Sequence, residues 1–122
     1  MSKIVKAINV MVSNPAKITH VTEGTHSDEL FFMYMDKHKW SMTRDSGGER
    51  YFLHFYPGNT PIEELASYDG PWEEIAMVTY ASSDLGGREA AASMRELYTI
   101  LREKQHGVDD ILDEIIADDI PF

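Results

Sequence analysis

The sequence LFFMYMDKHKWSMTRDSGGERYFLHFY occupies residues 30–56 and holds 8 of the 13 aromatic side chains of this 122-residue chain. It divides into three runs of aromatic and other apolar residues at positions 30–35, 39–44 and 50–56. Asp36-Lys37 separates the first run from the second, and residues 45–48 separate the second from the third. Apolar runs joined by short polar turns are typical of β-hairpins, because parallel neighbours need a much longer crossover. We therefore expect three consecutive antiparallel strands here.

The flanking sequence predicts two more strands and two helices. Shorter apolar runs at residues 17–22 and 75–80 predict one strand on each side of the three above. Residues 87–106 have the clearest helical pattern, an apolar stripe followed by Gly107 as a terminating residue. The segment Thr60-Pro61-Ile62-Glu63 has the spacing of a capping box and predicts a short helix to about Ser67.

Residues 3–12 fit two structures. Their apolar side chains recur with helical spacing after Ser2, a residue type that caps helices, and in part they also alternate as in a strand. We prefer the helix.

The expected fold is α+β, with an antiparallel β-sheet of about five strands and helices packed on one face. A strand at residues 3–12 would favour the alternative, a barrel of the OB type.

Length and composition limit the class of protein. A chain of 13.9 kDa with 43% hydrophobic residues makes one domain with one modest core. The absence of cysteine excludes disulfides, thiolate zinc sites and a cysteine nucleophile. No apolar run approaches the roughly 18 residues of a membrane-spanning helix, and no secretory leader pattern is present. We expect a soluble cytoplasmic protein with no membrane partner.

The net charge of −10 is unevenly distributed along the chain. Residues 1–107 carry −4, whereas residues 108–122 hold 6 acidic side chains and no basic one. We therefore expect a single α+β domain over residues 1–107, followed by an acidic C-terminal helix and docking tip over residues 108–122. The overall charge argues against a simple polyanion binder, but it is compatible with a neutral or basic face next to an acidic tail.

The acidic segment has the pattern of an amphipathic helix that stops at Pro121. Its apolar positions recur every three or four residues: Val108, Ile111, Leu112, Ile115 and Ile116. Its acidic positions fall on the opposite side: Asp109, Asp110, Asp113 and Glu114.

The final residues are Asp118-Asp119-Ile120-Pro121-Phe122. Phe122 offers an aromatic ring and an α-carboxylate on one residue, Pro121 limits the freedom lost on binding, and the aspartates favour a basic rim. This acidic Ile-Pro-Phe end resembles the C-terminal tip of bacterial single-stranded DNA-binding proteins. The resemblance covers 5 of the 122 residues. It implies a docking peptide for exonucleases, helicases, recombination mediators and a clamp-loader subunit.

Hairpin register sorts the aromatic side chains into two sheet faces. A two-residue turn at Asp36-Lys37 places Met33 opposite Trp40, and a loop at residues 45–48 places Trp40 opposite Leu53. One expected face is a core face: Phe31, Met33, Met35, Trp40, Met42, Tyr51, Leu53 and Phe55. The other face interleaves rings with cations and hydroxyl groups: Phe32, Tyr34, Lys39, Ser41, Thr43, Arg50, Phe52, His54 and Tyr56.

The second of these faces has the chemistry of a surface for single-stranded nucleic acid. Bases stack on aromatic rings, at about 1–3 kcal/mol each, while lysine and arginine neutralise phosphates. The predicted binding residues are Phe32, Tyr34, Lys39, Arg50, Phe52, His54 and Tyr56. The alternative is a face packed against a helix or a dimer mate, and a slip of one residue in either turn would exchange the two faces.

The sequence offers no constellation for catalysis, metal binding or a cofactor. Residues 82–88 join a strand to a helix but lack the Lys-Ser/Thr of a phosphate loop, so glycine-assisted capping explains them better. Adjacent carboxylates such as Glu63 and Glu64 point apart on a helix and make poor acid–base partners. The histidines lack spacing typical of metal ligation: His20, His26, His38, His54 and His106. We expect a protein that is not an enzyme.

Two functions are consistent with these patterns. The first is a single-stranded DNA-binding protein of replication, recombination or repair, encoded by a phage or mobile element, that recruits partners through its acidic tip. A homodimer would multiply its weak stacking sites. The second is an acidic protein-binding module, such as an inhibitor, immunity or mimic protein, that does not bind DNA.

Overall fold

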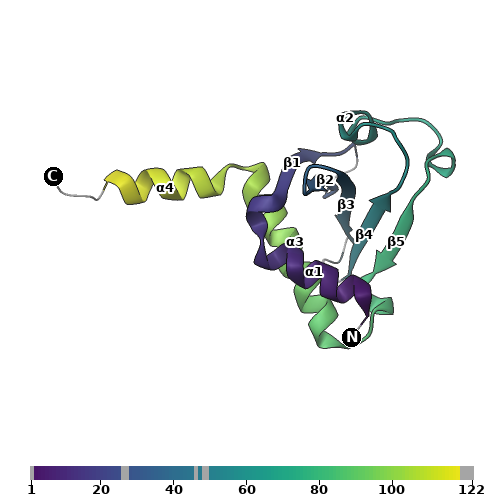
Figure 1. Ribbon diagram of the computed structural model, residues 1–122, viewed down its shortest axis with the longest axis horizontal. Helices are drawn as coiled ribbons and strands as arrows, with labels where there is room; N and C mark the ends of the chain where they lie inside the picture. Colours follow the sequence, from purple (N-terminus) through teal and green to yellow (C-terminus); the bar gives the residue numbers. More distant parts are fainter. Residues whose placement is uncertain (1, 26–27, 46, 48–49, 119–122) are drawn as a thin grey trace.

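The computed structural model describes residues 2–25, 28–45, 47 and 50–118 (Figure 1). Five strands form one antiparallel sheet in chain order: β1 (Ile18–Glu23), β2 (Leu30–Tyr34), β3 (His38–Arg44), β4 (Tyr51–Tyr56) and β5 (Val78–Ala81). The α-helices of this part of the chain are α1 (Lys3–Ser13), α2 (Ile62–Ala66), α3 (Gly87–Gln105) and α4 (Val108–Asp118), and short 3₁₀ helices lie at Pro15–Lys17, Trp72–Glu74 and Ser82–Asp84. Each strand therefore pairs with its neighbours in sequence, which is the arrangement that short turns favour.

The sheet is open, with β1 and β5 as its two edges. The expected α+β fold with five antiparallel strands is confirmed. The alternative of an OB-type barrel is wrong, because residues 3–13 form a helix and the two edge strands do not pair.

The first helix, α1, begins where Ser2 caps it. The Ser2 hydroxyl accepts a hydrogen bond from the backbone N–H of Val5 at 3.4 Å. Val5, Ile8 and Met11 are buried at helical spacing, which confirms the helix expected for residues 3–12. Asn14 ends it, and its side-chain amide donates to the carbonyl of Val10.

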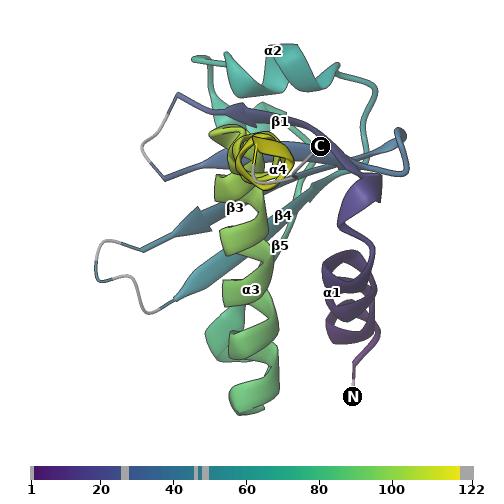
Figure 2. The same ribbon diagram turned by 90° about the vertical axis from the view of Figure 1, so that its left-hand side faces the viewer.

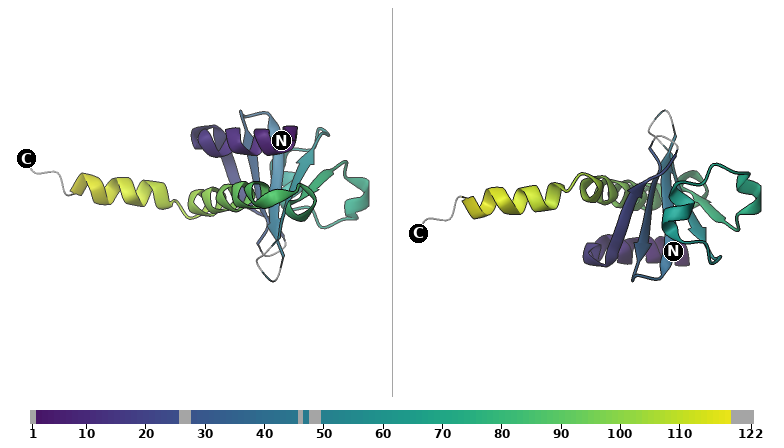
Figure 3. Two further views of the ribbon diagram at one scale, coloured as in Figure 1. Left: turned by 90° about the horizontal axis from the view of Figure 1, so that it is seen from below. Right: turned by 90° about the horizontal axis from the view of Figure 1, so that it is seen from above.

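The long helix α3 lies beside α1 on the same face of the sheet (Figures 2 and 3). The Ser93 hydroxyl of α3 donates to the Asn9 side chain of α1. Between these helices and the sheet lies the larger core cluster, which includes Ile8, Phe32 and Leu97. The expected start at Gly87 and the terminating Gly107 are confirmed, because α3 spans Gly87–Gln105 and Gly107 has a φ of 65°.

The short helix α2 lies on the opposite face of the sheet and encloses a second, smaller cluster around Phe31 and Tyr56. Helices therefore cover both faces, and the expectation that all helices pack on one face is wrong in this respect. The expected capping box is also wrong: Pro61 precedes α2, and no side chain accepts a capping hydrogen bond.

The last described helix, α4, follows Gly107 and extends away from the sheet and the other helices (Figures 1 and 3). It confirms the helix expected from the acidic amphipathic pattern. Among the residues that the structure describes, no helix combines the length and apolar character needed to cross a membrane.

Candidate nucleic-acid interface and docking helix

The turn between β2 and β3 sets the position of every aromatic side chain on β2. It contains three residues, Met35, Asp36 and Lys37, because β2 ends at Tyr34 and β3 begins at His38. Met35 and Asp36 both have left-handed backbone angles, with φ of 59° and 57°. The Met35 N–H donates to the carbonyl of Lys17, and the Asp36 carboxylate accepts from the Thr19 hydroxyl at 3.0 Å. The start of β1 thus stabilises this turn.

The expected two-residue turn is therefore wrong by one residue. Phe32, not Met33, lies opposite Trp40, and Tyr34 lies opposite His38. Because side chains alternate across a strand, this change moves all of β2 to the other face. Phe32 and Tyr34 belong to the core under α1 and α3, with exposed fractions of 0% and 7%. Neither ring is available to stack on a base.

The β3–β4 pairing also differs from expectation, but this difference does not move any side chain to the other face of the sheet. Trp40 lies opposite Phe55 and Met42 lies opposite Leu53, a shift of two residues from the expected pairs. A shift of two keeps each side chain on its expected face. The core face thus retains Trp40, Met42, Tyr51, Leu53 and Phe55, but it gains Phe32 and Tyr34 in place of Phe31 and Met33. Met35, also expected there, is a half-exposed turn residue.

The other face is partly covered by α2 and the segment that follows it. Phe31 and Tyr56 are buried there, with ring centroids 5.7 Å apart, and Trp72 lies against both rings. The Tyr56 hydroxyl lies 2.8 Å from the Ser41 hydroxyl. Burial raises the pKa of Tyr56 to about 12. Tyr56 is therefore on its expected face but is enclosed rather than open.

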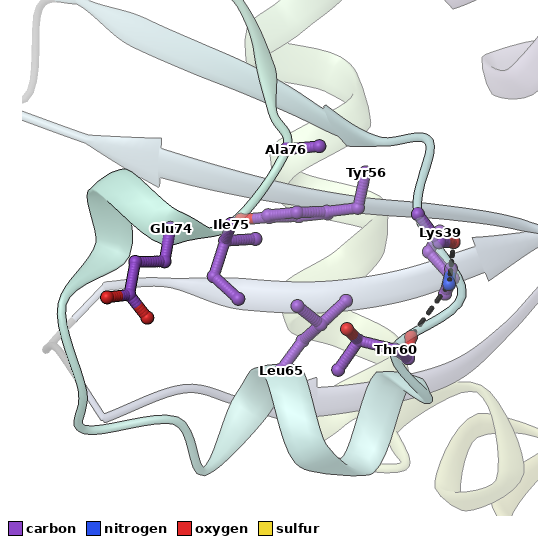
Figure 4. A pocket seen from close by; sticks show the side chains of 8 residues that line it. Lys39, Tyr56, Thr60, Leu65, Glu74, Ile75 and Ala76 are labelled. Atoms are coloured by element: carbon purple, nitrogen blue, oxygen red, sulfur yellow. Dashed lines mark hydrogen bonds between the residues drawn. The ribbon is translucent and has the colours of Figure 1, made fainter.

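Lys39, predicted to neutralise phosphate, is bound to a loop of its own chain. Its ammonium donates to the carbonyls of Gly58 and Thr60 at 2.6 and 2.7 Å (Figure 4). These atoms border a pocket of about 210 Å³ between α2 and the segment leading to β5, which Tyr56 and Leu65 also line. The ammonium links β3 to the loop between β4 and α2, so its geometry serves the fold.

The uncovered part of this face runs across β3, β4 and β5 and consists of Thr43, Arg50, Phe52, His54 and Thr79, which we name the open strip. His54 lies between two hydroxyl groups, with Nδ1 2.9 Å from Thr79 Oγ1 and Nε2 3.3 Å from Thr43 Oγ1. Burial lowers the pKa of His54, so the ring is neutral at pH 7. Its contribution to binding would be hydrogen bonding and not charge.

Arg50 and Phe52 form the end of the open strip that suits a nucleotide. The Arg50 guanidinium lies 5.7 Å from the centroid of the half-buried Phe52 ring. The same guanidinium donates to Asp45 at 3.1 Å, which reduces its positive potential. Of the seven predicted binding residues, the open strip brings together Arg50, Phe52 and His54. Thr79 was missed because the face was built from three strands without β5.

The docking segment is described as far as Asp118, the last residue of α4. Residues from Asp110 to Asp118 are all exposed, and so is their apolar side, with Ile115 and Ile116 exposed by 61% and 64%. The remaining predicted docking residues lie outside the described part of the chain: Asp119, Ile120, Pro121 and Phe122.

Two other kinds of site considered from the sequence are the loop at residues 82–88 and a metal site. Gly86 and Gly87 have positive φ at the start of α3, which confirms the glycine-assisted turn expected within residues 82–88. In the part of the chain that the structure describes, no group of three or more histidine, aspartate or glutamate side chains could hold a metal ion.

Comparison with protein-family models, with curated proteins and with solved structures finds no match to this chain.

Proposed function

We propose that this protein recruits proteins of single-stranded DNA metabolism through its acidic C-terminal segment, residues 108–122. The observation that carries the proposal is the exposure of α4 from Asp110 to Asp118 on a helix that extends away from the body (Figure 1). The sequence of the segment then continues into Ile120-Pro121-Phe122, which resembles the docking tip of bacterial single-stranded DNA-binding proteins. An extended acidic helix would present such a tip at a distance from the domain.

The chemistry of the segment indicates the chemistry of the receptor. Asp110, Asp113, Glu114 and Asp118 supply negative charge that steers the segment toward a basic surface. Phe122 would anchor it in an apolar pocket, and Pro121 would reduce the entropy lost on docking. The resemblance of the tip implies that such receptors include exonucleases and helicases.

A competition experiment tests this proposal. A purified exonuclease that binds the tip of single-stranded DNA-binding proteins is loaded with a fluorescent tip peptide, and the full chain is added while polarisation is measured. We expect the full chain to displace the peptide, and Phe122→Ala to displace it at least about tenfold less well. Ala117→Ser, at an exposed position of α4, is the control. No displacement by the unmodified chain would refute recruitment through this segment.

A second proposal, that the body binds single-stranded DNA, rests on a separate observation: the contact of Arg50 with Phe52 on the open strip. This surface is smaller than the one expected from sequence, since three of its predicted rings are buried. The charge of −4 on residues 1–107 opposes binding less than the full −10 does.

A gel shift with labelled oligo-dT at low salt separates the two proposals. It is run on the full chain and on residues 1–107, because the acidic segment would compete with DNA for cationic groups. We expect binding that weakens with salt, and Phe52→Ala should reduce affinity about fivefold to a hundredfold through lost stacking. Arg88→Ala, an exposed arginine outside the strip, is the control. If neither form shifts the DNA, the protein is the acidic module that binds proteins alone.

A further inference from the structure

An apolar groove lies beside α1, where the helix meets the β2–β3 hairpin. The groove has a volume of about 320 Å³ and is lined by Ala7, Val10 and Met11 of α1 and by Tyr34, His38 and Trp40 of the hairpin. Val10 is 53% exposed although it is apolar. Lys6 also lines the groove and supplies its positive charge.

A second apolar surface is the stripe on α4, which we define as Ile111, Leu112, Ile115 and Ile116. These side chains are exposed by 49–64%. They stand in pairs separated by four residues, so they form one continuous side of the helix. Contiguous apolar surface of this kind is characteristic of a protein-binding site.

The segments that carry these two surfaces are opposite in charge. Residues 1–22 contain Lys3, Lys6 and Lys17 and no acidic residue. The α4 segment has no basic residue, and Asp110, Asp113 and Glu114 are exposed on the side of the helix opposite the stripe. Two α4 helices would therefore repel each other, whereas α4 and α1 attract.

The position of α4 makes a second copy the natural occupant of the groove. α4 leaves the end of α3 and points away from the sheet (Figures 1 and 3). The groove lies along α1 at the β2–β3 hairpin. To reach its own groove, α4 would have to reverse direction at Gly107 and cross the domain. The groove of another molecule is not subject to this constraint.

We propose that the protein forms a dimer by exchanging α4, so that the stripe of each copy packs into the α1 groove of the other. Each molecule carries one stripe and one groove, so two equal contacts close a symmetric dimer and leave none unfilled. The eleven-residue α4 is about 16 Å long, which is the same length as α1. This inference uses the same helix as the proposed function, but it requires neither the tip at residues 120–122 nor the open strip.

Sedimentation of the full chain over micromolar to submillimolar concentrations tests the exchange. We expect a monomer–dimer equilibrium that weakens with salt, because the attraction between α1 and α4 is screened. Val10→Asp in the groove and Ile115→Asp in the stripe should each raise the dimer dissociation constant at least about tenfold. Met77→Asp, which changes another half-exposed apolar residue, should leave it unchanged.

Mixing the two weakened variants gives the decisive result. In a mixed dimer the intact stripe of Val10→Asp meets the intact groove of Ile115→Asp. One of the two contacts is then undamaged, so the mixture should associate more tightly than either variant alone. Lys6→Glu serves as a second groove variant, because Lys6 is exposed and its replacement cannot disturb the core. Circular dichroism checks that each variant is folded.

Three outcomes would overturn the exchange. These are a monomer at every concentration, a dimer that Val10→Asp and Lys6→Glu do not weaken, and a mixture of variants that remains monomeric. A chain lacking residues 120–122 should still dimerise while losing its tip receptors. A failure of the exchange is therefore distinguishable from a failure of recruitment.

Discussion

The Tyr56 hydroxyl lies 2.8 Å from the Ser41 hydroxyl, on the sheet face that α2 covers. Both side chains are buried, Tyr56 to an exposed fraction of 3% and Ser41 to 0%. Burial raises the pKa of Tyr56, the bond to Ser41 acts against this rise, and the nearby Glu29 carboxylate adds to it. Phe31 and Leu65 are buried in the same cluster as Tyr56, so this part of the face is packed beneath α2.

Tyr56→Phe should lower the free energy of unfolding by about 1 kcal/mol at pH 7, because it removes a buried hydrogen bond. The loss should shrink as the pH rises above 10. The pKa of Tyr56 is raised from 10.0 to about 12 on folding, so its neutral form stabilises the native state below pH 10 and this contribution is lost toward pH 12. Urea unfolding of both proteins at several pH values measures the difference. A difference that grew with pH would contradict this account.

His54→Gln should reduce the acid sensitivity of the protein. Burial lowers the pKa of His54 in the folded state. As the pH falls below 6.5, the imidazole is therefore protonated in the unfolded state before it is protonated in the folded state. Stability is therefore fully present above pH 6.5 and is lost as the pH falls through the lower pKa of the folded state. Glutamine can still bond to Thr43 and Thr79 without titrating, so the slope of stability against pH should flatten. His106→Gln is the control, since His106 is exposed.

Phe32→Ala and Phe52→Ala should separate stability from DNA binding. Phe32 is fully buried beneath the helices, so its truncation should cost about 3–5 kcal/mol. Phe52 is half-buried on the open strip, and its truncation should cost clearly less. Thermal unfolding measures both losses of stability. The oligo-dT gel shift measures whether Phe52→Ala also weakens the proposed binding of DNA. Equal losses of stability would show that Phe52 is a core residue like Phe32.

Lys39→Met should loosen the segment between β4 and α2, because it removes the two hydrogen bonds to Gly58 and Thr60. We expect a loss of about 1–2 kcal/mol, since both bonds have a charged donor but one is exposed. Hydrogen exchange of the backbone amides of residues 58–60 should become faster. Lys37→Met, in the neighbouring turn, controls for the removal of a positive charge. Unchanged exchange would mean that the lysine does not hold this segment.

Most of the secondary structure could be predicted from sequence because helix and strand periods are local. The helix expected over residues 87–106 is observed at Gly87–Gln105, and the strand expected over residues 39–44 at His38–Arg44. The weakest prediction was the edge strand β5, expected over residues 75–80 and observed at Val78–Ala81. The residues that precede it form a 3₁₀ helix at Trp72–Glu74 and border a pocket instead.

The candidate interface was predicted less well, and the error begins at Met35. Its left-handed backbone is rare for a residue with a long side chain, and nothing in the local pattern of alternating apolar residues indicates it. The bond from the Met35 N–H to Lys17, a residue distant in sequence, accompanies this conformation. One added turn residue was enough to move Phe32 and Tyr34 from the expected surface into the core.

By itself, the sequence determined which segments become helices and strands, the antiparallel order of the sheet, and the concentration of negative charge after residue 107. Only the tertiary structure decided which side of β2 faces α1 and α3, that α2 covers Phe31 and Tyr56, and that the apolar side of α4 is left exposed. The physical reason is that periodicity and charge belong to neighbouring residues. The burial of a face depends instead on the exact length of a turn and on contacts between residues far apart in the chain.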